Sequence, residues 1–471
     1  LQPAFWHGKS IMITLKKAAA VFIPAVVLPT LSLAAPGDLD TSFAGGDGIF
    51  IQAFDASSDW LNAVALQSDG KIVAAGYSSV NSGDFLVVRF NADGTLDNSF
   101  GTAGVVTTSI GASTELANAV AVQNDGKIVV AGYAFFGGQY DAAIVRYNTD
   151  GSLDTTFGGG DGIVTTSVAA IITDAINAIA IDASGNIWAA GTTWGGATGE
   201  DFLILSYDTD GNLNAAFDAD GILSISLGTT DRLADIAIQS DGRVVVTGTS
   251  GALFNVLRLN ADGSFDATFG GGDGIQTTPV GSSASPTALL IQPDNRIVLA
   301  GSANPSGTSS MTAVRYNTDG SLDGGFGTGG FATVPVGTGQ SVATDVLLQP
   351  DGKIILTGYA LGSGTSYDFA LTRLNANGTV DTTFGTAGST TTPLGTAYDL
   401  SYRSALQADG RIVLAGYSEV GGIRDSAIVR YMGGSASVGA TAIPTLSEWG
   451  LMILTGLLAL GAIPFMRRHR A

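Results

Sequence analysis

The sequence contains no cysteine and only two histidines among its 471 residues. The missing cysteines exclude disulfides, thiolate metal sites and a cysteine nucleophile. His7 and His469 lie in the terminal segments, so the region between them offers no histidine for a Ser-His-Asp triad, a histidine metal site or imidazole acid–base chemistry. Carboxylate chemistry stays open, because a glycosidase needs only two Asp or Glu side chains at a suitable separation.

Basic residues are scarce as well. Residues 35–445 hold 15 Lys and Arg against 40 Asp and Glu, a formal charge of −25. This balance argues against nucleic acid as a partner, because a nucleic-acid-binding domain needs a basic face. It is compatible with cation binding and with solubility outside the cell. Glycine is abundant at 66 residues, but apolar residues make up 45% of the chain, which indicates a folded protein rather than a disordered one.

The two ends carry apolar segments that stand apart from the fold. From Met12 the sequence reads MITLKKAAAVFIPAVVLPTLSLAAPG, with two lysines, an apolar run and a small-x-small site that ends at Ala34. Residues 1–34 are therefore expected to be a signal peptide that starts at Met12, with an uncleaved membrane anchor as the alternative. Residues 449–466 are uncharged and span about 27 Å at ~1.5 Å per residue, and RRHR follows them. This predicts a transmembrane helix with a cytoplasmic C-terminus.

Self-similarity dominates the region between these ends. The motif Q-x-D-G-[KR]-[IV], or a degenerate form of it, starts at residues 67, 123, 182, 239, 292, 349 and 407. Each of the seven units holds four strand-like runs rich in Val, Ile, Thr and aromatics, and no helical period of useful length occurs. We predict an all-β, seven-bladed β-propeller of four-stranded blades over residues 35–433. A linker at 434–442 would join it to the C-terminal segment 443–471.

Composition also predicts the strand order within a blade. The first run is short and small-sided, as expected near a crowded axis. The fourth run ends in Pro279, Pro335 or Pro393 in three units, and proline is tolerated at sheet edges. The second run carries a glycine in every unit, for example Gly76, which predicts close backbone approach between blades.

This order assigns the loops to two faces. The repetitive loops between runs one and two, and between runs three and four, share one face, which we call the turn face. The loops between runs two and three, and from run four to the next unit, share the opposite face. Their sequences differ from unit to unit, and we call this side the variable face. Function is expected there, since binding residues commonly lie on loops held by a rigid frame.

Charged residues recur inside the third run. An Arg occurs there in six units, and in five of them an Asp follows eight residues later. The five pairs are Arg89 and Asp97, Arg146 and Asp154, Arg258 and Asp266, Arg315 and Asp323, and Arg373 and Asp381. In the third unit both are replaced, by Ser206 and Asn214. A charge packed between blades needs a partner, so we predict an Arg–Asp ion pair in each regular blade.

The sixth Arg, Arg430, has no such Asp after it, because the seventh unit stops after its third run. A matching tail, DLDTSFAGGDGIFIQA, stands instead at residues 38–53. We predict that this N-terminal segment forms the fourth strand of the last blade, closes the ring and pairs Asp40 with Arg430.

These units resemble a known bacterial repeat. The stretches DG[KR]IVxAGY, VRYNxDGxLDxxFG and GIVxT are similar to the delta-60 repeat over roughly residues 37–432. The resemblance implies a β-propeller and export, without an established activity.

The C-terminal segment resembles the IPTL-CTERM sorting signal. The matching residues are Ile443, Pro444, Thr445, Leu446, Trp449 and Gly450. This resemblance implies an exosortase-like membrane protease of a Gram-negative bacterium as a partner. It also implies transient anchoring before the protein reaches the cell surface or the medium. The alternative is an ordinary C-terminal anchor, which explains the helix and the arginines but not the motif.

Residues 208–214, DTDGNLN, are the strongest metal candidate. Asp208, Asp210, Asn212 and Asn214 alternate like the first oxygen ligands of an EF-hand-like calcium loop, although the distal Glu is missing. The alternative is an Asp-Gly turn between two strands. No other cofactor is expected.

Aromatic residues in the variable loops are the candidates for ligand binding, because their rings stack on sugars or anchor a protein partner. The candidate residues are Trp60, Tyr140, Trp194, Tyr367 and Tyr398, together with Glu200. Packing across the mouth of the ring is the alternative. We expect an exported surface or matrix protein that binds a protein or glycan or serves as a scaffold, and not an enzyme. A carboxylate-dependent carbohydrate-active enzyme and a calcium-dependent adhesin are the alternatives.

Overall fold

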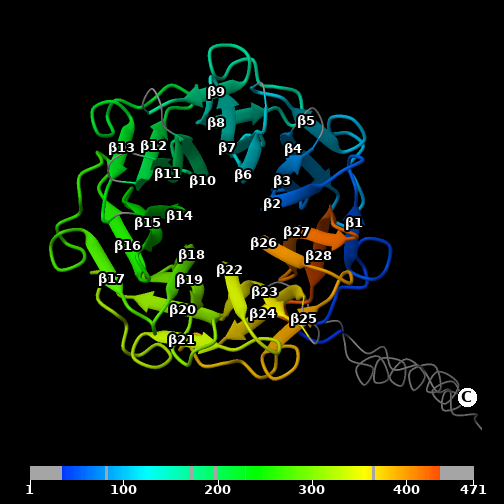
Figure 1. Ribbon diagram of the computed structural model, residues 1–471, viewed down its shortest axis with the longest axis vertical. Coiled ribbons are helices and arrows are strands. Elements are labelled where there is room, and N and C mark those ends of the chain that lie inside the picture. Colours follow the sequence, from blue (N-terminus) through cyan, green and yellow to red (C-terminus); the bar gives the residue numbers. More distant parts are fainter. Residues whose placement is uncertain are drawn as a thin grey trace, which may run out of the picture. The chain divides into compact units, whose positions relative to one another are not determined.

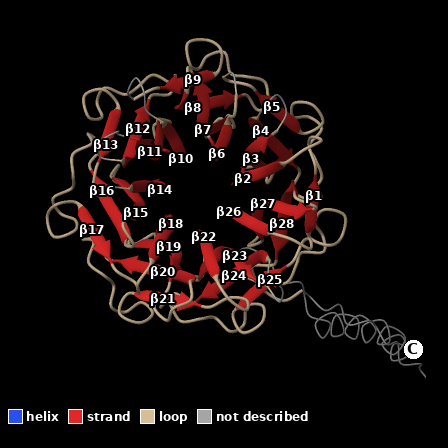
Figure 2. Cartoon of the chain, viewed as in Figure 1, coloured by secondary structure: helices blue, strands red, loops and turns tan. Residues whose placement is uncertain are grey.

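The computed structural model describes residues 34–79, 83–111, 113–168, 173–194, 199–228, 230–362 and 366–434. These residues form seven antiparallel four-stranded sheets, arranged as the blades of a propeller (Figures 1 and 2). The predicted all-β, seven-bladed architecture is confirmed. No helix in the described ranges is long and apolar enough to cross a membrane. Apart from Ala34 and Gly434, the predicted signal peptide, linker, sorting motif and transmembrane helix 449–466 lie outside the described residues.

Six of the blades run outward from the axis in sequence order, and in the seventh the outer strand is β1, from the start of the ring. The innermost strands are β2 (Asp59–Leu66), β6 (Leu116–Val122), β10 (Asp174–Ile181), β14 (Asp231–Ile238), β18 (Ala284–Ile291), β22 (Ser341–Leu348) and β26 (Asp399–Leu406). The second strands are β3 (Ile72–Ser78), β7 (Ile128–Phe136), β11 (Ile187–Trp194), β15 (Val244–Ser250), β19 (Ile297–Ala303), β23 (Ile354–Leu361) and β27 (Ile412–Val420).

The third strands are β4 (Asp84–Phe90), β8 (Gln139–Tyr147), β12 (Glu200–Tyr207), β16 (Phe254–Leu259), β20 (Ser310–Tyr316), β24 (Tyr367–Leu374) and β28 (Ile423–Tyr431). The outer strands are β5 (Val105–Thr108), β9 (Ile163–Thr166), β13 (Ile222–Ile225), β17 (Ile275–Thr278), β21 (Phe331–Val334), β25 (Ser389–Thr392) and β1 (Ile49–Gln52). We number the blades 1 to 7 from the one that begins with β2.

The N-terminal segment closes the ring, as the sequence predicts. Strand β1 pairs antiparallel with β28, with Ile49 opposite Val429 and Gln52 opposite Ser426. Blade 7 therefore contains β26, β27 and β28 from the C-terminal part of the ring and β1 from its beginning.

The hydrophobic core lies between neighbouring blades. Val87 of blade 1, for example, belongs to the same buried cluster as Val130 and Val145 of blade 2. Because each blade packs against a neighbour on both sides, both faces of the second and third strands are buried. This explains why they read as continuous apolar runs instead of alternating ones.

The recurring glycine of the second strand has a different cause from the one predicted. A Cβ on Gly76 would collide with the carbonyl oxygen of Trp60, which lies in the first strand of the same blade. A β-bulge between Leu61 and Ala63 brings that carbonyl inward. Similar collisions with a first-strand carbonyl oxygen occur at Gly132, Gly191, Gly248, Gly301, Gly358 and Gly416. The close approach is thus primarily within each blade, and the prediction of contact between blades was wrong.

The bulged residue also joins neighbouring blades around the axis. The Asn118 amide donates to the carbonyl of Ile176 at 2.8 Å, and the Thr287 hydroxyl donates to that of Ala343 at 2.7 Å. Asn62, Asn177 and Thr344 make the same kind of bond. In blade 4 the bulged residue is Ala234, and there the Asp235 carboxylate instead accepts from the Leu289 amide of blade 5.

Candidate functional site

The predicted Arg–Asp pairs form on the turn face. The Arg146 Nε donates to Asp154 Oδ2 at 2.7 Å, and both side chains are buried. The equivalent pairs of blades 1, 4, 5 and 6 have Nε–Oδ2 distances of 2.7–2.8 Å. This confirms the pairing inferred from the spacing of eight residues.

Each of these aspartates has a second cation as a partner. Lys127, from the Q-x-D-G-K motif, lies 2.9 Å from Asp154 Oδ2, and the Thr156 hydroxyl donates to Asp154 Oδ1 at 2.7 Å. Burial alone would raise the pKa of Asp154, but the bonds from Thr156, Lys127 and Arg146 outweigh it and hold the pKa well below its usual range. The carboxylate is therefore ionised at all but strongly acidic pH.

The arginine also connects its blade to the next one, which the sequence did not reveal. Arg258 donates to the carbonyl of Thr318 in blade 5 at 2.6 Å, while its guanidinium carbon lies 4.5 Å from the centroid of Phe269. The same stack occurs on the phenylalanine of each L-D-x-x-F segment outside blade 3. The turn face is thus a repeated structural joint.

Blade 3 lacks this joint, and the predicted calcium residues lie there. Asp208 Oδ1 accepts hydrogen bonds at 2.9 Å from the amides of Asp210 and Asn212, and Asn214 Oδ1 accepts one from the amide of Ala216. These oxygens stabilise a turn between β12 and β13. No three His, Asp or Glu side chains gather into a potential metal cluster in the described part of the chain. Calcium binding at 208–214 stays a prediction.

Where the ring closes, the same Arg–Asp pair and Arg–Phe stack form between the N-terminal segment and blade 7. Asp40 Oδ2 lies 2.8 Å from Arg430 Nε and 2.7 Å from Arg411 Nε, and Arg430 stacks on Phe43 at 4.3 Å. The predicted pairing of Asp40 with Arg430 is confirmed.

Both ends also replace the turn that blade 7 lacks. In blade 5 the Gly327 amide donates to the turn carbonyl of Asn377 at 2.8 Å, and in blade 6 the Gly385 amide donates to Pro36 at 2.7 Å. Arg373 donates to the carbonyl of Gly433, where the other arginines reach a turn. The first and last described residues of the ring therefore meet on the turn face.

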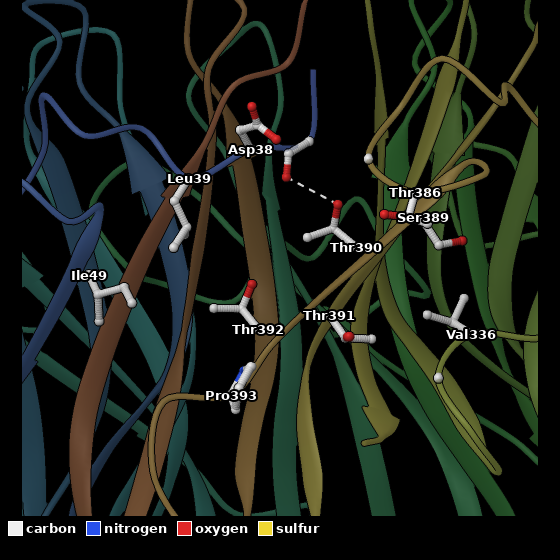
Figure 3. A pocket seen from close by; sticks show the side chains of 13 residues that line it. Asp38, Leu39, Ile49, Val336, Thr386, Ser389, Thr390, Thr391, Thr392 and Pro393 are labelled. Carbon is white, nitrogen blue, oxygen red and sulfur yellow. Dashed lines mark hydrogen bonds between the residues drawn. The ribbon is translucent and has the colours of Figure 1, made fainter. Parts of the chain in front are cut away.

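A hollow of about 780 Å³ lies beside this junction (Figure 3). Leu39 and Ile49 border it on one side and Thr390 and Thr392 of the β25 strand on the other. The Thr390 hydroxyl crosses the hollow and donates to the carbonyl of Gly37 at 3.1 Å. The hollow thus belongs to the closure of the ring.

The variable face carries stacked aromatic rings at the start of blade 1. The Trp60 ring is stacked on Tyr77 with centroids 4.2 Å apart. The Arg424 guanidinium carbon lies 5.4 Å from the Trp60 centroid and 4.8 Å from that of Tyr417, and Tyr402 lies 6.0 Å from Tyr417. Rings from blades 7 and 1 therefore both contact one cation.

Similar ring pairs continue on both sides. In blade 2, Tyr140 contacts Tyr133 edge-on at 5.0 Å. In blade 6, Tyr367 contacts Tyr359 at 5.2 Å and lies nearly parallel to Tyr398 of the following linker at 6.0 Å. We call the rings of blades 6, 7, 1 and 2 the aromatic arc. Its members are Tyr359, Tyr367, Tyr398, Tyr402, Tyr417, Trp60, Tyr77, Tyr133 and Tyr140.

The remaining candidates lie away from the arc. Trp194 ends β11 in blade 3 and is 56% exposed, while Glu200 forms an ion pair with Arg232 of blade 4. Tyr77, Tyr133, Tyr359 and Tyr417 were missed because they lie within the second strands. Their signal was the A-G-Y or T-G-Y sequence, whose tyrosine is replaced by Thr192, Thr249 and Ser302 in blades 3, 4 and 5. The predicted candidates Trp60, Tyr140 and Tyr367 also lie in strands and not in loops as expected, but each is within the first two residues of β2, β8 or β24.

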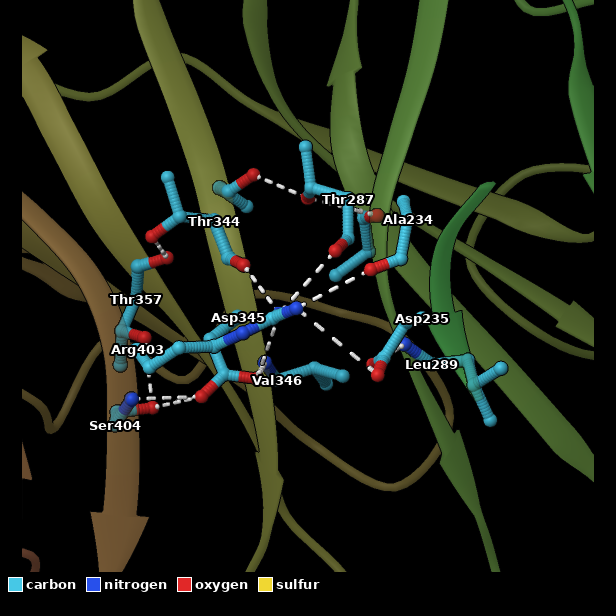
Figure 4. A network of polar contacts seen from close by, with 12 residues as sticks. Ala234, Asp235, Thr287, Leu289, Thr344, Asp345, Val346, Thr357, Arg403 and Ser404 are labelled. Carbon is cyan, nitrogen blue, oxygen red and sulfur yellow. Dashed lines mark hydrogen bonds and ion pairs between the residues drawn. The ribbon is translucent and has the colours of Figure 1, made fainter. Parts of the chain in front are cut away.

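The central axis holds a charged network that the sequence also did not reveal (Figure 4). Arg403 of blade 7 donates to the carbonyls of Thr287 and Thr344 at 3.2 Å and of Ala234 at 3.3 Å. Asp235 and Asp345 lie 4.0 and 3.9 Å from its guanidinium. Burial raises the pKa of both carboxyls, and Arg403 opposes that shift. One side chain thus links blades 4, 5, 6 and 7 across the channel.

Two known families match parts of the chain. The family described as "Domain of unknown function (DUF5122) beta-propeller" matches residues 67–100, 123–157, 239–269, 292–326, 349–384 and 407–433. The IPTL-CTERM motif matches residues 441–470. Both resemblances predicted from the sequence are confirmed. The third unit, with Ser206 and Asn214, lies outside the matched ranges. No curated protein matches the chain.

Several solved structures are similar to this chain at low identity. A catalytically inactive virginiamycin B lyase from Staphylococcus aureus, with quinupristin, is 12% identical with a TM-score of 0.48, over 81% of this chain and 98% of that one. Sqt1 from Chaetomium thermophilum is 12% identical with a TM-score of 0.45, over 84% and 86%. Puromycin hydrolase is 14% identical with a TM-score of 0.47, over 87% and 58%. Similarity at this level concerns the fold alone.

Proposed function

We propose that this protein, which is built from DUF5122 beta-propeller repeats and carries an IPTL-CTERM motif, is an exported surface protein that binds a glycan chain on its variable face. The aromatic arc is the observation that carries this proposal. The rings span four consecutive blades, whereas blades 3, 4 and 5 carry Thr or Ser in place of the second-strand tyrosine. An architectural role alone would call for the same residue in every blade.

The chemistry of the arc suits sugars. Aromatic rings offer apolar faces for the C–H surfaces of pyranose rings, and tyrosine hydroxyls provide hydrogen bonds at their edges. Trp60, Tyr77, Tyr133, Tyr359 and Tyr367 are half-buried, and Tyr398 is 45% exposed. Rings held this firmly by their neighbours lose little conformational entropy when a ligand binds.

The position of the chain ends supports display of this face. Pro36 and Gly434 lie side by side at the junction on the turn face, so the described chain ends on that side of the ring, and the sorting motif at 441–470 follows in the sequence. An exosortase-like membrane enzyme acting on that tail would hold the ring by its turn face. The variable face would then point away from the membrane.

Glycan binding is tested with the full-length chain against immobilised neutral, acidic and amino-sugar oligosaccharides. We expect at least one class to bind, and Trp60→Ala and Tyr367→Ala to weaken that binding at least tenfold, about 1.4 kcal/mol. Phe265→Ala is the matched control, because Phe265 is an exposed aromatic residue on the turn face. Equal binding by all four proteins, or no binding by the wild type, would contradict the proposal. Released reducing ends would favour the alternative of a carbohydrate-active enzyme.

A further inference from the structure

An acidic residue recurs at the inner start of the blades on the variable face. It is Asp59, Glu115, Asp174, Asp231 or Asp399, in blades 1, 2, 3, 4 and 7, and each is fully buried. One carboxylate oxygen accepts amides of the linker from the preceding blade. Asp399 Oδ2, for example, accepts from Leu394 at 2.7 Å and Gly395 at 2.9 Å. This carboxylate oxygen therefore has a structural role.

A second acidic residue lies on the preceding blade, near the start of its third strand. In the order above these residues are Asp425, Asp84, Asp141, Asp201 and Asp368. The two positions change together around the ring. Where blade 5 begins with Ala284, the preceding blade carries Leu253, and where blade 6 begins with Ser341, the preceding blade carries Ser310. Two acids are thus present at a junction, or none.

Two carboxylates across a buried junction repel each other unless a positive charge compensates them. Glu115, Asp174 and Asp399 are 0% exposed, and the acids of the preceding blade at the same junctions, Asp84, Asp141 and Asp368, are at most 8% exposed. Repulsion that recurs in several junctions, and disappears from both partners together, indicates a shared cation.

Blades 7 and 1 show how such a junction is satisfied by protein groups. Asp59 Oδ1 accepts hydrogen bonds from the amide and the hydroxyl of Ser426, the residue after Asp425. At the junction of blades 6 and 7 the equivalent residue is Phe369, whose side chain has no donor. Asp399 Oδ1 accordingly has no hydrogen-bond partner among the described residues, although Asp399 is 0% exposed.

A second oxygen beside it is also unpartnered. The Ser418 hydroxyl is 1% exposed and makes no hydrogen bond within the described ranges. Both atoms face the same spot beside Gly395. A Cβ built there would lie 2.9 Å from Ser418 Oγ, 3.4 Å from the Glu419 carbonyl oxygen and 3.5 Å from Asp399 Oδ1. Three oxygens thus converge next to a residue without a side chain.

We propose that the junction of blades 6 and 7 binds a calcium ion through the carboxylates of Asp368 and Asp399 and the hydroxyl of Ser418. The donors are all oxygens, which suits a hard cation, and two carboxylates balance its charge. Calcium accepts irregular coordination completed by carbonyls and water. Only two of the proposed ligands are carboxylates, and the others are neutral oxygens. The site therefore does not contain three acidic or imidazole groups.

This site adjoins the aromatic arc through the chain itself. Tyr367 precedes Asp368 and Tyr398 precedes Asp399, and the two rings lie 6.0 Å apart. A bound ion would therefore fix both tyrosines. Calcium binding does not require the glycan function, and the two proposals fail separately: one on calcium affinity, the other on glycan affinity.

The test uses the full-length chain, stripped with a chelator and titrated with calcium alone. We expect a heat of binding and a rise in Tm with calcium concentration, since a ligand that binds only the folded state stabilises it. Terbium in place of calcium is expected to luminesce through the adjacent tyrosines. Asp399→Asn and Ser418→Ala should each weaken calcium binding at least tenfold. Ser418→Ala keeps the proposal testable if Asp399→Asn does not fold.

Asp208→Asn is the matched control, because it alters the turn-face candidate and leaves the junction intact. Calcium affinity unchanged in Asp208→Asn supports the junction site. The absence of both the heat and the Tm shift in the wild type would overturn the proposal. Loss of calcium binding in Asp208→Asn, with retention in Asp399→Asn and Ser418→Ala, would also overturn it. A Tm that responds to acidification but not to calcium would show that the two carboxylates share a proton instead.

Discussion

Arg146 illustrates how single residues hold this ring together. Its guanidinium binds Asp154, lies 4.3 Å from the Phe157 centroid and donates to the carbonyl of Thr209 in blade 3. The spacing of eight residues and the joint replacement in the third unit were enough to predict the ion pair. The carbonyl and the phenylalanine could not be predicted, because neither position carries a charge that demands a partner.

Removing one member of the Arg146–Asp154 pair should lower the free energy of unfolding by more than the subsequent removal of the other member. Arg146→Ala leaves a buried carboxylate and should lower the free energy of unfolding by about 3–5 kcal/mol. Asp154→Ala added to it should cost much less, so the double-mutant cycle should give a coupling energy of about 1–3 kcal/mol. Additive losses, measured by urea unfolding, would contradict the pairing.

The same cycle has an expected pH dependence. The pKa of Asp154 is lowered in the folded state, so its stabilisation is fully present above the unfolded pKa near 3.8 and is lost as pH falls through the lower folded pKa. The coupling should therefore be constant from pH 7 to pH 5 and decline only in strong acid.

Arg403 occurs once, and no repeat points to it. Arg403→Ala would leave Asp235 and Asp345, whose side chains are 17% and 14% exposed, beside three carbonyls with no cation. We expect a loss of about 3 kcal/mol at pH 7, the lower end of the range for fully buried pairs. The pKa of both carboxyls is already raised and should rise further in the variant. Since a raised pKa means that stability is lost as pH rises through it, the variant should recover stability relative to the wild type as pH falls from 7 toward the unfolded pKa of 3.8. A variant Tm that falls in parallel with the wild type over this range would refute the role of Arg403.

At the scale of strands, periodic composition predicted more than individual motifs did. Val, Ile and Thr runs separated by Asp-Gly turns predicted the number and order of strands. They do so because a strand buried on both faces is restricted to apolar and β-branched residues. Gly76 shows where this failed. The sequence revealed that a side chain is not tolerated at this position, but not which backbone approaches it. The β-bulge in the facing strand has no characteristic residue type, so it could not be predicted from the sequence.

The candidate site was predicted least well at this scale. Trp60, Tyr140, Tyr367 and Tyr398 were expected from their loops, and the structure places them against strand tyrosines such as Tyr77 and Tyr359. A tyrosine at a strand end reads as ordinary β-sheet composition. Its contribution to a surface depends on which blades stand side by side, and that is set by the ring and not by local sequence.

At the scale of the molecule, the ring is closed by segments from its two ends. Residues 38–53 complete blade 7, and the bond between Gly385 and Pro36 extends the closure to blade 6. Closure of this kind gives every blade a neighbour on both sides, so that no blade is left with an apolar face in water. It also couples the stability of the ring to one short N-terminal segment.

Deletion of residues 37–53 tests this closure. Without them Arg430 loses Asp40, β28 becomes an exposed edge and Phe43 leaves a buried cluster shared by blades 7 and 1. We expect a Tm lower by more than 10 °C and a larger hydrodynamic radius.

A peptide of residues 37–53 should restore both in a concentration-dependent manner, because it supplies the same strand without the high effective concentration of a linked segment. A peptide with Asp40→Asn and Phe43→Ala is the matched control and should restore less. If the deletion leaves Tm and radius unchanged, the N-terminal strand does not hold the ring closed. Destabilisation that the peptide fails to reverse would mean that the closure must form during folding, before the seventh blade is complete.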